Sequence, residues 1–204
     1  IMKDILFISP NNARNIYQNL STKYSAIEPP TWALLLSESC RSKGFSVAIL
    51  DCLAENLSAD ESYKRILEIN PRIICFVVYG QNVNAGTTNM SGATYLSSYL
   101  KEKNVVQPIC FVGSHIQALP VETLNKEKSI DIGLCNEGVY SIWNLLKIRN
   151  FNFENLKKIK GIVFRSKNEI VVNEPEVVVP QERMDIDLPG YAWDLLPKHK
   201  KPLD

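Results

Sequence analysis

The chain alternates between short runs of almost continuous apolar residues and longer segments in which apolar residues recur every three or four positions. Short, β-branched apolar runs are typical of buried parallel strands, and the longer periodicity is typical of helices with one buried face. The predicted strands are Asp4–Ser9, Ser46–Leu50, Arg72–Tyr79, Pro108–Val112 and Ile130–Leu134. This alternation predicts an α/β fold with a doubly wound, five-stranded parallel sheet in the flavodoxin-like (Rossmann-like) order 2-1-3-4-5.

The segments between the strands carry helix signals. Pro29-Pro30 precedes the first predicted helix, where proline is favoured. The segment Gly80–Asn89 is rich in Asn, Gly and Thr, so we expect a loop there; loops of this length often carry function. The predicted helices are Thr31–Lys43, Glu61–Ile69, Ser91–Lys103, Val121–Lys126 and Val139–Ile148.

After the last of these helices the pattern changes, which suggests three parts. Residues 1–150 form the predicted sheet domain. Within 151–180, Gly161–Arg165 and Ile170–Asn173 predict a small C-terminal β-hairpin extension. Residues 181–204 are Pro-rich and irregular, and we interpret them as a linker that packs against a part absent from this chain. In the alternative interpretation, this tail folds back on its own domain.

Composition narrows the class of protein. Apolar residues make up 45% of the chain and charged residues 22%, enough for a sizeable core, and the formal net charge is +1. The absence of a long basic run argues against a nucleic-acid partner. No apolar run reaches the roughly 20 residues of a membrane helix, and no signal peptide precedes the first strand. We therefore expect a cytoplasmic protein with no nucleic-acid and no membrane partner.

The sequence lacks the common catalytic and metal-binding motifs. Its five cysteines are widely and irregularly spaced, so we predict no metal site and no iron–sulfur cluster held by this chain. It also lacks the glycine-rich dinucleotide-binding motif, the P-loop and the nucleophile elbow. We expect no catalytic residue in this chain, and a binding function instead.

Small polar residues follow the predicted strands, at the edge where an open α/β sheet binds its ligand. The strand order puts the switch point between the first and third strands, so the ligand site should lie there and at the ends of the fourth and fifth strands. The predicted ligand-binding residues are Ser9, Pro10, Asn11, Tyr79, Gly80, Gln81, Asn82, Gly113, Ser114, His115, Cys135, Asn136, Glu137 and Gly138.

Several of these positions also have a purely structural interpretation. His115 either contacts a ligand or caps the short helix that follows it. Glu137 either binds a ligand hydroxyl or amide, or interacts with the N-terminus of the next helix. Gly80 and Asn82 either line the site or only form a turn.

Short motifs occur in a characteristic order along the chain. They are Pro29-Pro30 before a helix with Ala33-Leu34-Leu35, Lys43-Gly44-Phe45-Ser46-Val47, Leu50-Asp51, Phe111-Val112-Gly113-Ser114-His115, Ala118-Leu119-Pro120, Glu122, Asp131-Ile132-Gly133, Glu137-Gly138, Leu188-Pro189 and Ala192-Trp193-Asp194-Leu195-Leu196-Pro197. The ordered set covers nearly the whole chain. It resembles the N-terminal cobalamin-binding domain of radical S-adenosylmethionine (SAM) proteins, the class containing oxidative cyclases and cobalamin-dependent methyltransferases.

Two features depart from that family. Asn136-Glu137-Gly138-Val139 stands where the family has Gly-Glu-Gly-Glu. The C-x-x-x-C-x-x-C motif of the radical domain is absent, and we expect it beyond Asp204.

The resemblance implies that this chain binds cobalamin, while the iron–sulfur cluster and S-adenosylmethionine belong to a radical SAM domain that would be its partner. The D-x-H-x-x-G motif that supplies a histidine to cobalt is absent, so cobalamin should bind with its own base displaced and no protein histidine on cobalt. Gly113 and Ser114 would leave room for the nucleotide tail, and Tyr79–Asn82 would line its pocket. The whole protein would catalyse methyl transfer or oxidative cyclisation of an unknown small molecule, and this chain alone would not be catalytic.

Two other functions stay open at this point. In the first, the domain shares the fold of the cobalamin-binding family but serves as a cofactor-free docking or substrate-recognition module. The departures at Asn136 and Val139 favour this interpretation. Alternatively, it is a stand-alone flavodoxin-like binder of a flavin or small nucleotide, although no phosphate-binding loop follows the first strand.

Overall fold

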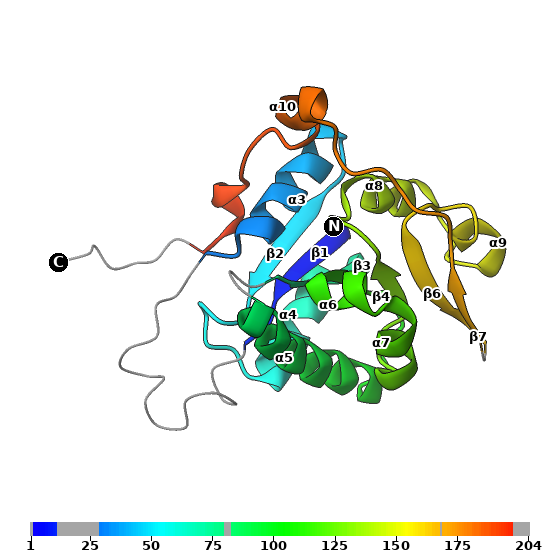
Figure 1. Cartoon of the computed structure of the whole chain (residues 1–204). Helices are drawn as coiled ribbons and strands as arrows, with labels where there is room; N and C mark the ends of the chain where they lie inside the picture. Colours follow the sequence, from blue (N-terminus) through cyan, green and yellow to red (C-terminus); the bar gives the residue numbers. More distant parts are fainter. Residues whose placement is uncertain (1, 12–28, 80–82, 168, 198–204) are drawn as a thin grey trace.

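A seven-stranded sheet forms the centre of the molecule in the computed structural model, which describes residues 2–11, 29–79, 83–167 and 169–197. The strand order is β2-β1-β3-β4-β5-β6-β7 (Figure 1). Strands β1 to β5 pair in parallel, and β6 and β7 are antiparallel to their neighbours. The strands are β1 (Lys3–Ser9), β2 (Val47–Asp51), β3 (Pro71–Val78), β4 (Ile109–Gly113), β5 (Ile132–Leu134), β6 (Ile162–Ser166) and β7 (Glu169–Val172).

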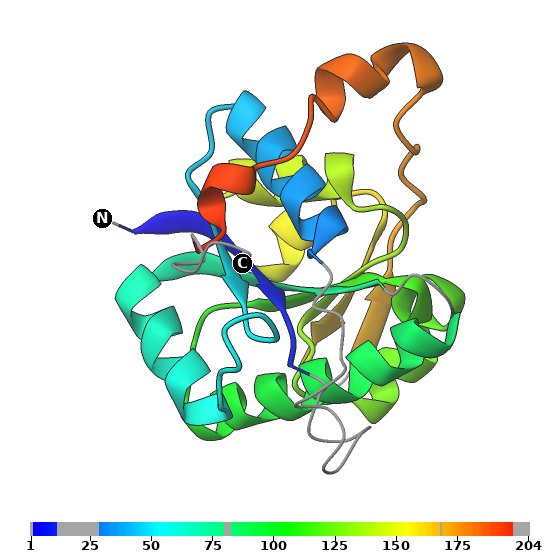
Figure 2. The same cartoon turned by 90° about the vertical axis from the view of Figure 1, so that its left-hand side faces the viewer.

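Helices cover both faces of the sheet and give three layers (Figure 2). One core lies between the sheet and α3 and α8, and the other lies between the sheet and α4, α5, α6 and α7. The described helices are α3 (Thr31–Ser42), α4 (Ala59–Ile69), α5 (Val83–Glu102), α6 (Ser114–Ala118), α7 (Pro120–Lys126), α8 (Val139–Lys147), α9 (Phe153–Leu156) and α10 (Met184–Asp187), with 3₁₀ turns η1 (Gln181–Arg183) and η2 (Trp193–Leu195).

Burial on both faces explains why the strands are apolar along their whole length. In β1, Phe7 packs into the core under α3 and α8, whereas Leu6 and Ile8 pack into the opposite core. All three side chains are fully buried. The predicted parallel order 2-1-3-4-5 is confirmed for the first five strands.

The predicted hairpin is not a separate extension, because its two strands join the main sheet. β6 pairs with β5 through Ile132–Phe164, Gly133–Val163 and Leu134–Ile162. The three β6 residues in this pairing are fully buried. Without β6, β5 would be an edge strand with unpaired backbone groups, so the hairpin completes the sheet.

Helix α5 begins earlier than the sequence pattern suggests. It starts at Val83, so most of the loop predicted over Gly80–Asn89 is helical, while Gly80 to Asn82 lie outside the described residues. Helix propensity is a weak guide here. Once Met90, Ala93 and Leu96 are packed on the sheet, each preceding residue adds a hydrogen bond at low entropic cost.

The described part of the tail, residues 181–197, lies on its own domain, over α3 (Figure 1). Ala192 is fully buried and its amide donates to the Leu34 carbonyl. The alternative interpretation therefore holds for these residues, which bury Asp187 as well. A role as the connection to a further domain stays a prediction.

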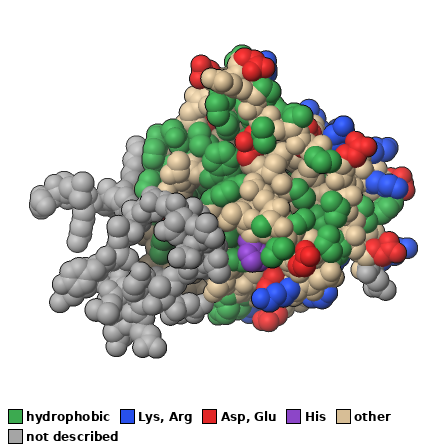
Figure 3. All heavy atoms as spheres, in the orientation of Figure 1, with side chains coloured by type: hydrophobic (Ala, Val, Ile, Leu, Met, Phe, Trp, Pro, Cys, Tyr) green, Lys and Arg blue, Asp and Glu red, His purple; other side chains and the backbone are tan. Residues whose placement is uncertain are grey.

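Among the residues that the structure describes, no helix is both long and apolar enough to cross a membrane. Acidic and basic side chains intermingle on the face drawn in Figure 3, which shows no patch of a single charge.

Candidate binding site at the strand ends

The carboxyl ends of β1, β3, β4 and β5 meet at one edge of the sheet, as the strand order requires. Ser9 ends β1 and is followed by Pro10 and Asn11, Tyr79 follows β3, His115 lies just beyond β4, and Cys135 to Gly138 follow β5. Gly80, Gln81 and Asn82 were predicted for the same site but lie outside the described residues. The structure thus brings most of the predicted positions to one edge, at which doubly wound sheets bind ligands.

Tyr79 lies at the centre of a polar and aromatic cluster on the side of α3 and α8. Its hydroxyl accepts a hydrogen bond from the Gln117 side-chain amide at 2.7 Å and lies 3.5 Å from the Asn136 carbonyl. The Trp32 ring contacts it edge-on, with 5.5 Å between ring centres. Burial raises the pKa of Tyr79, so the phenol stays neutral and keeps its proton for donation.

Glu137 connects this cluster to two distant segments. Its backbone carbonyl accepts a hydrogen bond from the Trp32 indole at 3.1 Å, and its carboxylate accepts one from the Val179 amide. The carboxylate therefore holds the segment that follows β7, which is not the helix-terminus contact considered from the sequence. A ligand role for Glu137 remains a prediction.

Asn136 holds the same segment and also closes a turn just before the next helix. Its side-chain amide donates to the Glu176 carbonyl at 3.0 Å, and its carbonyl oxygen accepts from the Gly138 amide at 2.9 Å. Gly138 follows with a φ of +89°, a conformation that favours glycine. The loop between β5 and α8 is therefore fixed by its own hydrogen bonds.

The structure explains the glycine at position 113 differently from the sequence expectation. A Cβ at this position would lie 2.3 Å from the Val78 carbonyl oxygen, so the neighbouring strand occupies the space predicted for a nucleotide tail. Ser114 is exposed and begins α6, and His115 is half-buried within it. Contact of Gly113, Ser114 or His115 with a ligand remains a prediction.

Asn11 lies on the other side of the sheet, at a cavity of about 310 Å³. Ser9 is half-buried, its carbonyl accepts from the Cys52 amide, and Pro10 is buried. In the cavity wall, the Ser62 hydroxyl donates to the Ser58 carbonyl at 2.8 Å. The cavity lies between the start of α4 and α5 and is lined by Asn11, Cys52, Leu57, Ser58, Ala59, Ser62, Gly92, Tyr95 and Leu96.

The cysteines and acidic residues offer no metal site in the part of the chain that is described: no group of three or more His, Cys, Asp or Glu residues is arranged to hold a metal ion. Cys135 is half-buried, and burial raises the pKa of its thiol, which therefore stays protonated.

Sequence reasoning missed Trp32, Gln117 and Val179. Trp32 lies in the first turn of α3, and the signal that could have found it is Pro29-Pro30, which marks the start of this helix near the strand ends. Gln117 and Val179 carry no local signal, because they reach Tyr79 and Glu137 only through the tertiary fold.

An α/β sheet with this strand order and a ligand edge at its switch point defines the class of cofactor-binding doubly wound domains. Residues 19–145 match the model of the B12 binding domain family. The chain belongs to this family.

Solved structures show the same fold. TsrM from Kitasatospora setae, a radical SAM methyltransferase solved with cobalamin and a [4Fe-4S] cluster bound, matches 89% of this chain with a TM-score of 0.63 and 15% identity. The cobalamin-dependent radical SAM enzyme OxsB matches 95% with a TM-score of 0.62 and 15% identity. The aligned regions cover 30% of TsrM and 24% of OxsB, so this chain spans less than a third of their lengths. The search of curated proteins finds no match.

Proposed function

We propose that this chain binds cobalamin at the carboxyl edge of its sheet and is the cofactor-binding part of a longer radical SAM enzyme. The observation that carries the proposal is the family match over residues 19–145. The Tyr79 cluster lies within the matched region, at the switch-point edge of the sheet. The iron–sulfur cluster and S-adenosylmethionine would be held by the rest of that enzyme, its partner domain.

The residues at the edge suit such a cofactor. Corrin carries amide side chains around an apolar ring, and the described edge offers the Tyr79 hydroxyl, the Gln117 amide and the Trp32 ring. The sequence lacks the D-x-H-x-x-G motif, and His115 is part of α6, so we expect no protein histidine on cobalt.

When bound, cobalamin would supply the chemistry of methyl transfer or assist an oxidative ring closure in the whole enzyme. The residues of this chain bind and orient it. All five cysteines are free, which suits the reducing cytoplasm that we propose as its location.

A titration with hydroxocobalamin, followed by gel filtration, tests the proposal. We expect the coloured cofactor to elute with the protein and its visible spectrum to shift. The Tyr79→Phe variant removes one hydroxyl and should weaken binding by roughly two- to tenfold, the range for one hydrogen bond. Tyr99→Phe, whose hydroxyl bonds Asp60 at the surface, is the matched control and should bind like the wild type.

A cofactor-free docking module is the second candidate, and one observation favours it. Asn136 and Glu137, two predicted ligand residues, are both engaged with the segment that follows β7. Complete separation of protein and hydroxocobalamin, both for this chain and for the full-length protein, would favour this function and contradict cobalamin binding.

A further inference from the structure

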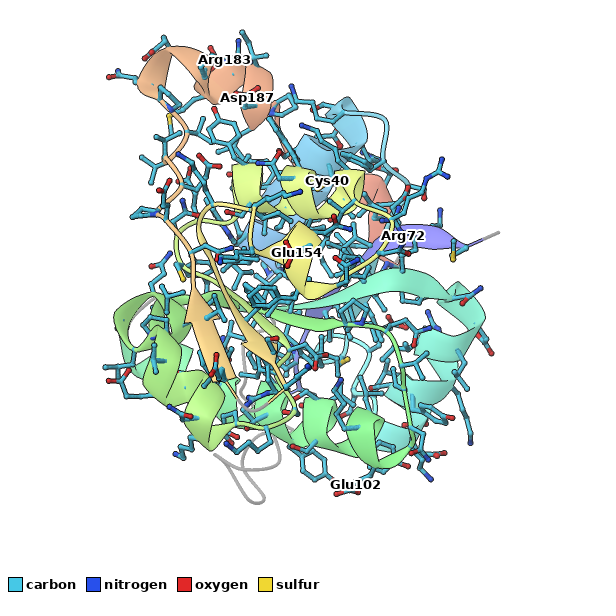
Figure 4. All side chains as sticks on the ribbon, turned by 90° about the vertical axis from the view of Figure 1, so that its right-hand side faces the viewer. Cys40, Arg72, Glu102, Glu154, Arg183 and Asp187 are labelled. Atoms are coloured by element: carbon cyan, nitrogen blue, oxygen red, sulfur yellow. The ribbon has the colours of Figure 1, made fainter. Side chains whose placement is uncertain are left out.

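Asp187 is a buried carboxylate that gathers partners from three parts of the molecule. Its side chain is 1% exposed, and it lies with Arg183 on the short helical segment formed by η1 and α10 (Figure 4). One oxygen accepts from Lys43 at 3.2 Å and from Arg183 at 2.9 Å. The other accepts from the Tyr140 hydroxyl at 2.8 Å and from Arg183 at 3.1 Å.

The chain around Asp187 is also bonded to α3. The buried Ser39 hydroxyl donates to the Asp187 carbonyl at 2.6 Å. Further along, the Arg41 guanidinium forms an ion pair with Asp194 at 2.7 Å. We refer to residues 181–197 as the strap. At Asp187 the side-chain hydrogen bonds of the strap reach both the C-terminal end of α3 and the start of α8.

The same two helices meet again at the strand ends. Trp32, in the first turn of α3, donates to the Glu137 carbonyl just before α8. Ser39 lies two helical turns from Trp32, about 10 Å along the axis, and Tyr140 lies in the first turn of α8. Because helices are stiff over such distances, a change in how α3 sits against α8 at Asp187 would move the Trp32–Tyr79 pair.

We propose that Asp187 is a positioning residue for the strand-end site. By binding Lys43 at the end of α3 and Tyr140 at the start of α8, its carboxylate holds the two helices in the arrangement that places Trp32 against Tyr79. Its hydrogen bonds within the described part of the chain go to Ser39, Lys43, Tyr140 and Arg183 rather than to the Tyr79 cluster, so it acts through the helices. This inference rests on the proposed function only where cofactor affinity is the readout.

The test compares Asp187→Asn, Asp187→Glu and Asp194→Asn. The last variant weakens the exposed contact between the strap and Arg41 and leaves α8 untouched, so it is the matched control. We expect Asp187→Asn to weaken hydroxocobalamin binding at least about fivefold, the lower range of coupling between distant sites. Asp187→Glu, which keeps the charge, should recover part of the affinity, and Asp194→Asn should bind like the wild type.

Near-ultraviolet circular dichroism gives a second readout that needs no cofactor. The signal of the Trp32–Tyr79 pair is defined as the part that the Trp32→Phe variant loses. We expect Asp187→Asn to lose it too while its far-ultraviolet spectrum stays that of a folded chain. If Asp187→Asn does not fold, Tyr140→Phe removes one bond of the network and should reduce the same signal.

The outcomes separate the two proposals. If the wild type fails to bind hydroxocobalamin, the proposed function fails, and the dichroism alone decides the role of Asp187. If the wild type binds but Asp187→Asn retains both affinity and the Trp32-dependent signal, the positioning role is refuted. Equal losses in Asp187→Asn and Asp194→Asn would reduce Asp187 to a general stabilising contact and also overturn the inference.

Discussion

Replacing Gly113 by alanine should strongly destabilise the sheet. The added Cβ would lie 2.3 Å from the Val78 carbonyl oxygen and 2.8 Å from its carbonyl carbon. Carbon atoms make favourable contacts at about 3.5 Å or more, so the end of β4 would have to move away from β3 by about 1 Å. Val78 and Gly113 are the last pair of the β3–β4 ladder, and both atoms in the clash belong to the backbone, which cannot rotate away.

Overpacking of this kind costs about 1–3 kcal/mol, and we expect the upper end because no side chain can yield. The φ of 160° is extended backbone that alanine adopts easily, so the cost is steric. Urea unfolding followed by far-ultraviolet circular dichroism measures the loss, with the exposed neighbour Ser114→Ala as a control that should stay within about 0.5 kcal/mol of the wild type.

A loss below about 1 kcal/mol in Gly113→Ala, with the slope of the transition unchanged, would refute this account of how closely β3 and β4 approach. The prediction also changes how a binding test at this position is read. A bulky substitution at Gly113 that abolishes cofactor binding would report damage to the sheet, because the space is already filled by Val78.

Three further predictions concern the thiols, the anchor at Glu137 and the charge of Asp187. In the native chain a thiol reagent should react faster with the half-buried Cys135 than with the other cysteines, because burial keeps the reagent away from the other four thiols, and a second fast thiol would contradict this; the slow set is Cys40, Cys52, Cys75 and Cys110. Glu137→Ala should lower the free energy of unfolding by about 1–3 kcal/mol by leaving the Val179 amide unpaired, and Glu137→Gln, which keeps an acceptor, should lose less; equal losses in urea unfolding would argue against the contact. The hydrogen bonds from Arg183 lower the pKa of Asp187 from 3.8 to about 2, so its charge stabilises the fold above pH 4 and that contribution, about 2 kcal/mol, disappears as the pH falls from 4 to 2. The stability difference between wild type and Asp187→Asn should shrink over that range, and a difference that stays constant with pH would be inconsistent with a charged Asp187.

The local pattern of the chain was enough to predict the elements that build the parallel sheet. The apolar run Asp4–Ser9 became β1 with the shift of a single residue, and the helix after Pro29-Pro30 begins at Thr31 as expected. Strand order followed from the alternation of strands and helices, because crossovers between parallel strands share one hand and leave few arrangements. The edge at which the site lies then needed no further information.

Contacts between distant segments were beyond the reach of the sequence. Trp32 and Glu137 are 105 positions apart, and Ser39 and Asp187 are 148 apart. Neither contact can be read from the local sequence, because a tryptophan in the first turn of a helix and an aspartate in a polar segment do not indicate which distant residue they meet. Gly113 was noticed as a glycine at a strand end, but its neighbour Val78, which explains it, comes from the third strand.

The sequence by itself therefore determined the types of the elements, the order of the parallel strands and the edge at which the candidate site lies, since hydrophobic periodicity is a local property that burial on both faces of a sheet imposes on each segment. The tertiary structure decided which residues meet at that edge, how the hairpin completes the sheet and where the strap lies. Those outcomes depend on the packing of segments that only the folded chain brings together.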